Sequence, residues 1–333
     1  MFKVKLEREL SPNSIVDCHT HAGGENLYGK MVGKEYPFVQ SVCDLRFKQL
    51  SFGINDTVVF PMPSTLYFRY KKRGEKSIFS WEPSGLMEFP YQVENEALLE
   101  EIRIARVLYP SGHIFPFLNI APLIEESLQI NHLEKLMEKY GFFGLKFHSS
   151  ATNASAEDLI DSLFIQFMNM HNIPIIVHSG YPNDKANPNH AVKLAQAHPD
   201  IRLSIAHLAG WDRDAFEIIK SIPNIYVDCS PFLANIVSVV SANYQRFVSP
   251  QKMEIHTINP IDILVLIFKL IPDQLIWGTD EPWTTYNYDT GSLIGKILYK
   301  DEIRVLEDMK RRGFRSIFDR ITNLNPRKFL FGN

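Results

Sequence analysis

Two histidines near the N-terminus, His19 and His21, have the spacing of a pair of metal ligands. They end an apolar run that begins at Ile15, and residues two apart in a β-strand point to the same face, so both imidazoles can bind one cation. The small residues at 22–24 leave room above the pair. A His-x-His pattern alone is more often structural or accidental than metal-binding, so its meaning depends on what the rest of the chain brings to the same place.

Three later apolar runs end in the same kinds of side chain. His178 closes IIVHSG, His207 closes LSIAHLAG and Asp280 closes LIWGTDEP. Either histidine alone could be a core residue with satisfied hydrogen bonds, but four strand ends of this kind favour a shared site. Imidazole and carboxylate are the ligands expected for zinc or a similar divalent ion at a catalytic site, which keeps one coordination position open for water.

Eight short β-rich apolar runs alternate with amphipathic segments along the chain. The runs cover residues 15–22, 54–63, 113–122, 144–150, 173–180, 202–210, 224–231 and 274–283. Segments 124–140, 156–171 and 212–222 have apolar residues at three- and four-residue steps, as amphipathic helices do. Eight such units predict an α/β fold of the (β/α)₈ TIM-barrel type, whose active sites lie at the C-terminal ends of the strands.

We expect a single domain over residues 1–333, with a barrel core at about 15–290 and C-terminal helices at about 299–331. Two connections are longer than usual: 64–91 after the second strand and 232–273 after the seventh, the latter with a helix ending near Ile271. Long insertions on the C-terminal side of a barrel are more often functional than accidental.

Composition excludes several classes of partner. A formal charge of -3 without a long basic run argues against nucleic acid. No stretch approaches the roughly 20 apolar residues of a membrane span, and the N-terminus lacks an apolar signal core. The three cysteines have no Cys-x-x-Cys spacing and are odd in number, which favours a reducing compartment. We therefore expect a cytoplasmic protein that acts on a small molecule.

Several short motifs, taken in order, resemble the amidohydrolase superfamily, particularly its amidohydrolase-related (amidohydrolase 2) branch. They are Asp17-x-His19-x-His21, Gly-Leu-Lys-Phe-His at 144–148, His178, His207 with Leu-Ala-Gly, and Gly278-Thr-Asp280-x-Pro282. The resemblance runs over roughly residues 15–283, and the segment 325–331 also resembles the C-terminal helix of that branch. It implies a metal-dependent hydrolase or decarboxylase, with a homodimer as an option.

The resemblance implies a role for each matching position. His19, His21, His178 and Asp280 would hold one metal, most simply Zn²⁺, with Mn²⁺, Fe²⁺ or Co²⁺ as alternatives. His207 would lie near the metal, where it can orient water or polarise the reacting group. Asp280 would serve as both ligand and proton shuttle, because a carboxylate beside a metal-activated water can take and return its proton.

Lys146 and His148 leave two alternatives open. In binuclear relatives a lysine at this strand is carboxylated and bridges two metals, which would make these residues part of a second metal site. Otherwise Lys146 forms an ion pair in the lower barrel and His148 lines the pocket wall. We expect one metal rather than two.

The remaining candidates have weaker signals. Asp228 could hold a metal-binding histidine in place, or it could cap a helix or loop. Four residues could shape a substrate pocket or be structural: Trp211, Arg213, Trp283 and Arg69. Six other histidines are expected at the surface or in packing: His113, His132, His171, His190, His198 and His256.

Three functions compete. The leading hypothesis is hydrolysis, in which metal-activated water attacks an amide, lactone or related carbonyl. The alternative is non-oxidative decarboxylation of an aromatic or unsaturated acid, which would need arginines that hold the carboxylate; Arg46, Arg69 and Arg213 are the candidates. A barrel that binds metal or ligand without turnover would be expected to have lost a ligand, and all four positions are filled.

Overall fold

The computed structural model describes residues 10, 13–23, 40–62, 68–73, 76–81, 87–181, 183–240, 248–282, 286–287, 292–293 and 298–332. Side chains at 68–81, 237, 238, 240 and 286–293 lie outside the description. None of the described helices is long and apolar enough to span a membrane.

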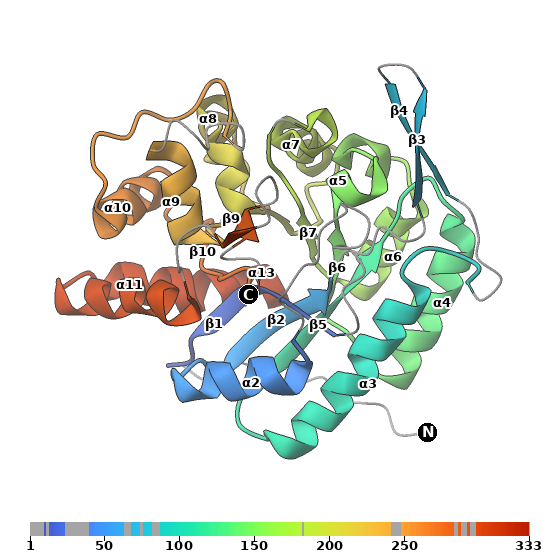
Figure 1. Ribbon diagram of the computed structural model, residues 1–333, viewed down its shortest axis with the longest axis horizontal. Helices are drawn as coiled ribbons and strands as arrows, with labels where there is room; N and C mark the ends of the chain where they lie inside the picture. The colour runs from blue at the N-terminus through green and yellow to red at the C-terminus, as the bar shows by residue number, and fades with distance from the viewer. Residues whose placement is uncertain are drawn as a thin grey trace.

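Eight parallel strands form the centre of the molecule (Figure 1). They are β1 (Val16–Ala22), β2 (Asp56–Pro61), β5 (Ile114–Ile120), β6 (Gly144–Phe147), β7 (Ile175–Val177), β8 (Leu203–Ile205), β9 (Ile225–Asp228) and β10 (Leu275–Ile276). Their order in the sheet is their order in the chain. Each strand lies inside one of the eight predicted runs, so this part of the prediction is confirmed.

Backbone hydrogen bonds join the first strand to the last. The amide of Cys18 donates to the carbonyl of Trp277 at 3.0 Å, and the amide of His21 donates to that of Glu281 at 2.8 Å. A parallel bridge also pairs Thr20 with Glu281. The sheet therefore curls back onto β1, which confirms the barrel.

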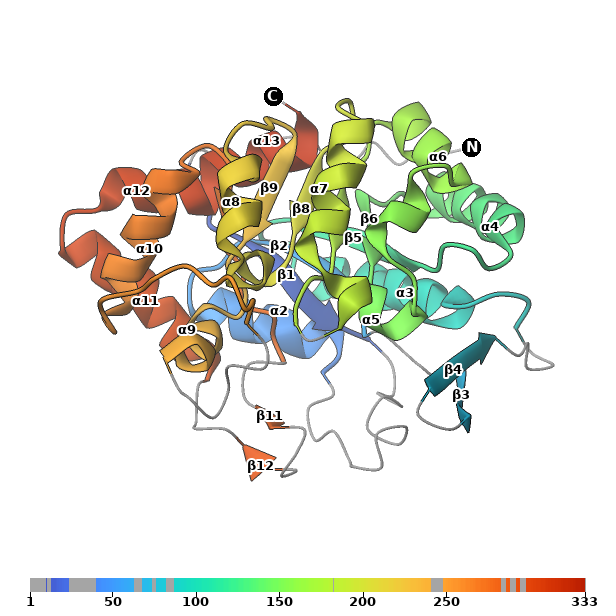
Figure 2. The same cartoon turned by 90° about the horizontal axis from the view of Figure 1, so that it is seen from above.

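Helices surround the strands (Figure 2). Those between strands are α2 (Val42–Ser51), α3 (Gln92–Leu108), α4 (Glu126–Lys139), α5 (Ser149–Thr152), α6 (Leu163–His171), α7 (Pro188–Ala197), α8 (Arg213–Ile219), α9 (Phe232–Val240) and α10 (Pro260–Leu270). The C-terminal helices are α11 (Tyr299–Arg311), α12 (Arg315–Asp319) and α13 (Asn325–Phe331), with a π-helical turn at Arg320–Leu324. Short 3₁₀ turns lie at Ala156–Leu159, Asp184–Ala186 and His207–Trp211.

Local sequence explains where several helices begin. Ser41 and Asp44 form a reciprocal capping box at the start of α2. Asn259 caps α10 and is followed by Pro260, whose fixed φ suits the first helical turn. The predicted helix ending near Ile271 is α10, and the same insertion also contains α9, which the sequence reading did not single out.

The insertion after β2 contains an antiparallel hairpin, β3 (Phe68–Arg73) and β4 (Lys76–Trp81). Figure 1 shows this hairpin standing apart from the barrel. A second small pair, β11 (Tyr286–Asn287) and β12 (Ser292–Leu293), follows β10.

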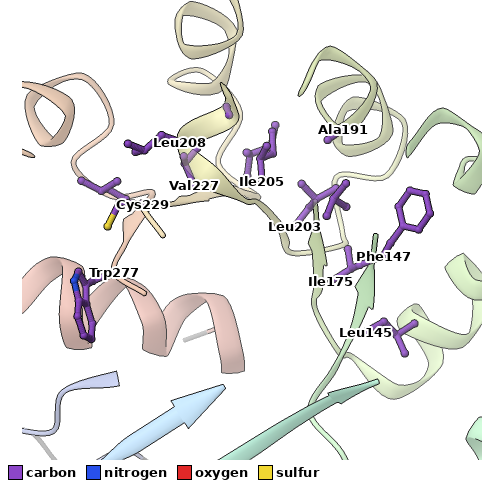
Figure 3. Packing of buried hydrophobic residues seen from close by; sticks show 14 of the residues in the cluster. Leu145, Phe147, Ile175, Ala191, Leu203, Ile205, Leu208, Val227, Cys229 and Trp277 are labelled. Carbon is purple, nitrogen blue, oxygen red and sulfur yellow. The ribbon is translucent and has the colours of Figure 1, made fainter. Parts of the chain in front are cut away.

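Two large hydrophobic clusters make up most of the core. The larger lies between strands and helices, and Figure 3 labels Leu145, Ile175, Leu203 and Ile205 from the strand side and Ala191 from α7 among its members. The smaller fills the barrel with residues from the strands and the C-terminal segment: Leu10, Val16, Cys18, Val58, Phe60, Phe115, Phe117, Phe143, Ile176, Ala206, Tyr226, Ile276, Phe329 and Leu330. Alternation along most strands thus separates an outer face from an inner one, and β1 departs from it at a register shift between Asp17 and Thr20.

Candidate metal centre

Three ligand-type side chains converge where the strands end. Among the described residues, His19, His207 and Asp280 each bring one donor atom within 4.8 Å of the others. His19 belongs to β1, His207 begins the turn after β8, and Asp280 follows β10. The group therefore lies at the C-terminal ends of the strands, where the sequence led us to expect chemistry.

Asp280 is the centre of this group. Its Oδ1 atom lies 3.3 Å from Nε2 of His19 and 3.3 Å from Nε2 of His21. Its Oδ2 atom lies 3.9 Å from Nδ1 of His207. Burial alone raises the pKa of this carboxyl group, but the charge of His19 and the hydrogen bonds to both histidines outweigh burial and hold the pKa well below its usual range.

His19 is oriented from behind by Asp228. Its Nδ1 atom donates to Oδ2 of Asp228 at 3.0 Å, and Oδ1 of Asp228 accepts from the Ser230 hydroxyl at 2.5 Å. Burial raises the pKa of Asp228, but His19 and Ser230 outweigh it and lower that pKa to about 2. A histidine that donates its Nδ1 hydrogen to a carboxylate keeps the Nε2 lone pair for a metal.

The same argument fixes the hydrogen on His21. Its Nδ1 atom lies 3.3 Å from the carbonyl oxygen of Pro61, which can only accept, so Nδ1 donates and Nε2 carries the lone pair. Burial lowers the pKa of His21 to about 4, which favours the neutral ring. The Nε2 atoms of both histidines thus face one carboxylate oxygen of Asp280, an arrangement that suits either hydrogens on these two nitrogens or one bound cation between the three atoms.

The spacing of these donor atoms fits a divalent metal. Zinc bonds of about 2.1 Å in tetrahedral geometry separate neighbouring ligand atoms by roughly 3.4 Å. The two distances from Asp280 to His19 and His21 are 3.3 Å. Neutral imidazoles and an ionised carboxylate are also the chemical types that zinc, manganese, iron and cobalt accept.

His178 lies one contact away from this group. Nδ1 of His207 donates to the carbonyl of Ser230 at 2.7 Å, so in the neutral ring Nε2 of His207 accepts from Nδ1 of His178 at 3.0 Å. The Nε2 atom of His178 therefore keeps its lone pair. Burial lowers the pKa of His178 well below its usual range and that of His207 below its usual value. The two histidines are adjacent, and His207 is the one that shares the 4.8 Å group with Asp280.

His148 stacks on His178, with ring centroids 3.9 Å apart and an interplanar angle of 13°. Its Nδ1 atom accepts from the amide of Ala151 at 3.2 Å, which leaves the hydrogen of the neutral ring on Nε2. Burial lowers the pKa of His148 well below its usual range. The structure thus places His148 beside the histidine cluster as a neutral hydrogen-bond donor.

Lys146 is buried on the inner face of β6, at 1% exposure. Its Nζ atom lies 3.4 Å from Nε2 of His19 and 4.5 Å from the ring centroid of Phe60. Burial lowers its pKa to about 8. Within the described part of the chain, no ion pair of 4.0 Å or less joins Lys146 to a carboxylate. The geometry therefore does not support the alternative in which Lys146 forms an ion pair.

Two expected pocket residues lie elsewhere. Trp211 is 1% exposed and packs in the larger hydrophobic core, so it is a core residue. Arg213 has a side chain 60% exposed and pairs with Asp214 at the surface. Arg46 is buried and donates to Gln49 and to backbone carbonyls, so it is committed to the fold. The side chain of Arg69 and all of Trp283 lie outside the described residues.

The six histidines expected outside the site are indeed used elsewhere. Five hydrogen-bond or pair with groups on neighbouring elements: His113, His132, His171, His190 and His198. His256 is 86% exposed.

Sequence reasoning missed the residues that brace the strand ends. The Asp17 carboxylate accepts from the amide and hydroxyl of Thr279 and from the Tyr299 hydroxyl, and burial raises its pKa to about 7. The carboxylate of Glu281, which follows Asp280, pairs with Lys48 of α2. Lys48 and Tyr299 lie on α2 and at the start of α11, outside every motif, so nothing in the sequence marked them.

A barrel with histidines and an aspartate gathered at its strand ends defines a class of metal-dependent (β/α)₈ enzymes. Residues 16–331 match the model of the amidohydrolase family. That match spans nearly the whole chain, so the chain belongs to the amidohydrolase family. No curated protein matches it in sequence.

Solved structures share the fold over almost the whole chain. One is 5-carboxyvanillate decarboxylase from Sphingomonas paucimobilis, with a TM-score of 0.60, 8% identity, and coverage of 95% of this chain and 98% of that one. Another is the 5-carboxyvanillate decarboxylase from Novosphingobium aromaticivorans with bound manganese and 3-methoxy-4-hydroxy-5-nitrobenzoic acid. Its TM-score is 0.59 and its identity 10%, with coverage of 96% of this chain and 98% of that one. An apo protein from Agrobacterium tumefaciens has a TM-score of 0.56 and 14% identity, with coverage of 96% of each chain. At these identities the similarity establishes the fold.

Proposed function

We propose that this amidohydrolase-family chain is a metal-dependent hydrolase that cleaves an amide, lactone or related carbonyl of a small molecule. The observation that supports it is the convergence of two Nε2 atoms, from His19 and His21, on the Asp280 carboxylate. His178 is the fourth proposed ligand, because its Nδ1 hydrogen is committed to His207 and its Nε2 lone pair is retained.

The chain's own residues divide the chemistry. A divalent metal bound here would lower the pKa of a water molecule towards neutrality and polarise the carbonyl. Asp280 would accept the proton of that water and return it to the leaving group, since one of its oxygens lies away from His19 and His21. The two ring nitrogens of His207 contact Ser230 and His178, so His207 would orient the water or the reacting group by exchanging one of these contacts. His148 would line the pocket as a hydrogen-bond donor.

Three finer statements belong to the same proposal. Zinc is the proposed metal, and one ion is proposed rather than two, because the donor spacing suits a single centre. Manganese is the alternative to test, since the Novosphingobium structure contains it. We also propose a single-domain protein that acts in the cytoplasm, as its free cysteines Cys18, Cys43 and Cys229 suggest. A homodimer is proposed on family grounds alone.

Decarboxylation is the second candidate, and two observations bear on it in opposite directions. Arg46 and Arg213, two of the three arginines that could hold a substrate carboxylate, are committed elsewhere. Lys146, however, is a buried amine beside His19 and could meet a carboxylate. The loss of the two arginines makes hydrolysis the better supported reaction.

Two measurements test the proposal. Chelation should abolish activity, and Zn²⁺ or Mn²⁺ should restore it. A panel of lactones and amides set against aromatic and unsaturated acids should then give turnover with the first group and no released CO₂ with the second. CO₂ release from an acid, with no lactone or amide cleaved, would replace hydrolysis by decarboxylation.

Asp280→Asn should lower kcat by about a thousandfold or more while the chain still folds, because the proposed proton acceptor is lost. Asp214→Asn is the matched control, since Asp214 is 60% exposed and pairs only locally with Arg213. An Asp280→Asn variant with undiminished kcat would remove Asp280 from the proposed mechanism.

A further inference from the structure

Lys48 joins two elements that carry proposed metal ligands. It lies on α2, with a side chain 35% exposed, and forms an ion pair with Glu281, whose side chain is 7% exposed. Its Nζ atom also donates to Oε1 of Gln40 at 3.2 Å. Within the described residues, Lys48 is the cation paired with the Glu281 carboxylate.

Both contacts lead directly to the metal centre. Glu281 follows Asp280 in the chain, and its carbonyl accepts from the His21 amide at 2.8 Å. Gln40 donates from Nε2 to the carbonyl of His21 at 3.0 Å. The Lys48 amine is thus connected, through Glu281 and Gln40, to the backbone next to Asp280 and to the backbone of His21.

The backbone at Asp280 needs such restraint. Its φ is 58°, in the left-handed region that residues with a Cβ rarely adopt, and this conformation persists only where the surroundings hold it. The Asp280 amide donates to the His19 carbonyl at 2.7 Å, and the Glu281 amide donates to the Thr279 hydroxyl at 3.3 Å. The Lys48 pair adds a side-chain anchor one residue beyond Asp280.

Without Lys48, Glu281 would be a nearly buried carboxylate that has no other cation to pair with among the residues the structure describes. A buried charge that loses its partner is strongly unfavourable, so the side chain would turn towards water. Because Glu281 and Asp280 are adjacent, that movement would rotate the segment that directs the Asp280 carboxylate at His19 and His21.

We propose that Lys48 is a positioning residue that holds Asp280 and His21 at the spacing a divalent metal requires. This inference rests on the proposed metal-dependent function. The inference and simple electrostatics predict opposite effects of removing Lys48 on metal affinity. Loss of a nearby positive charge should by itself tighten cation binding, whereas loss of positioning should weaken it.

The test is the affinity of the metal-free full chain for Zn²⁺, measured by competition with a chromogenic chelator. Lys48→Met should weaken Zn²⁺ binding by about 10- to 100-fold, as changes to residues that orient ligands commonly do. In the zinc-loaded enzyme kcat should fall more than KM rises. Lys48→Arg should restore most of the affinity, because it keeps the charge that pairs with Glu281.

A matched control and a second variant complete the design. Lys139→Met removes a lysine that is 67% exposed and lies 3.9 Å from Glu100, a loose surface pair. The Zn²⁺ affinity of this variant should equal that of the wild type. Glu281→Gln should weaken Zn²⁺ binding as Lys48→Met does, and the double variant should be no weaker than either single one, because the pair acts as a unit. Lys48→Gln, which also removes the positive charge, serves if Lys48→Met does not fold.

Unchanged or tighter Zn²⁺ binding in Lys48→Met, or in Lys48→Gln if that is the variant that folds, would overturn the positioning role. A wild-type chain that binds no divalent metal would overturn the proposed function and this inference together. The two failures are therefore distinguishable in one titration series.

Discussion

Asp280 combines an unfavourable backbone with a central place in the site. Its left-handed φ of 58° costs roughly 1–2 kcal/mol for a residue with a Cβ. The return is that the carboxylate reaches His19 and His21 at the same time. Strain of this kind commonly accompanies function, and here it lies at the residue whose oxygens face both proposed ligands and His207.

Asp228 acts on the same site through His19. Asp228→Asn weakens the hydrogen bond that keeps the His19 hydrogen on Nδ1, so the Nε2 lone pair would no longer be reserved for a metal. Zn²⁺ affinity should fall by about 10- to 100-fold, measured by chelator competition. The exposed change Asp214→Asn should have no effect. Equal Zn²⁺ affinity in Asp228→Asn and wild type would show that His19 needs no such support.

At the scale of elements, β1 owes its inward-facing histidines to an irregularity. The register between β1 and β2 shifts between Asp17 and Thr20, where three steps along β1 match two along β2. Val16 and Cys18 belong to the inner cluster, and simple alternation would then turn His19 outward. The extra residue resets the alternation, so His19 and His21 also reach the centre.

β1 also depends on the close approach of the segment after β10. A Cβ at Gly278 would lie 2.8 Å from the Cβ of His19 and 2.9 Å from its backbone nitrogen, closer than real side chains come. Gly278→Ala should therefore push the two segments apart and displace His19 from Asp280.

We expect Gly278→Ala to lose most of its Zn²⁺ affinity and to be destabilised by about 1–3 kcal/mol, the usual range for overpacking. Metal analysis and thermal unfolding measure both effects. Gly53→Ala is the comparison: its φ is 73° but nothing lies within 4 Å, so stability should drop slightly while metal binding stays intact. A Gly278→Ala variant that keeps its metal would mean that β1 can yield without disturbing the site.

The elements were largely predictable and some placements were not. Eight strands could be predicted because each is a local apolar run between turn residues. The shift in β1 could not, since it depends on pairing with β2. The sequence left Trp211 as either a pocket or a structural residue. Residues 207–211 all have positive φ, and this left-handed turn places the indole in the core. Lys48 and Tyr299 reach the site only because α2 and α11 pack beside it.

At the scale of the whole molecule, the C-terminal helices pack against different parts of the barrel: α11 contacts the outer helix α9, and α13 contacts the strands. Glu302 of α11 is fully buried, and its carboxylate accepts from the Leu233 amide of α9 at 2.9 Å. Burial raises its pKa to about 8 from an ordinary value near 4.5. The native state therefore keeps a proton that the unfolded chain releases between these two pH values.

This difference gives a pH dependence with a definite sign. Between pH 4.5 and about 8 the unfolded state binds fewer protons at this position, so the free energy of unfolding should fall as pH rises. Glu302→Gln, which is neutral at every pH, should remove the fall and exceed the wild type by a few kcal/mol, as an order of magnitude, near pH 8.

Urea unfolding at pH 5 and pH 8 measures the effect of Glu302→Gln, and the advantage should shrink at pH 5. Glu254→Gln, at a residue 83% exposed, should behave as the wild type at both values. A constant difference between Glu302→Gln and wild type across this range would contradict the buried-proton account.

The last helix has a consequence for the timing of folding during synthesis. Phe329 of α13 packs on Phe117 and Tyr226 inside the barrel, and Arg202 donates to its carbonyl. All eight strands are translated before residues 325–331, so a ribosome-bound chain has every strand yet lacks the side chains that fill its lower opening. Until those residues leave the exit tunnel, Phe117 and Tyr226 remain uncovered. This nascent intermediate should be the species that chaperones bind, and ribosome stalling just before residue 325 should prolong that binding.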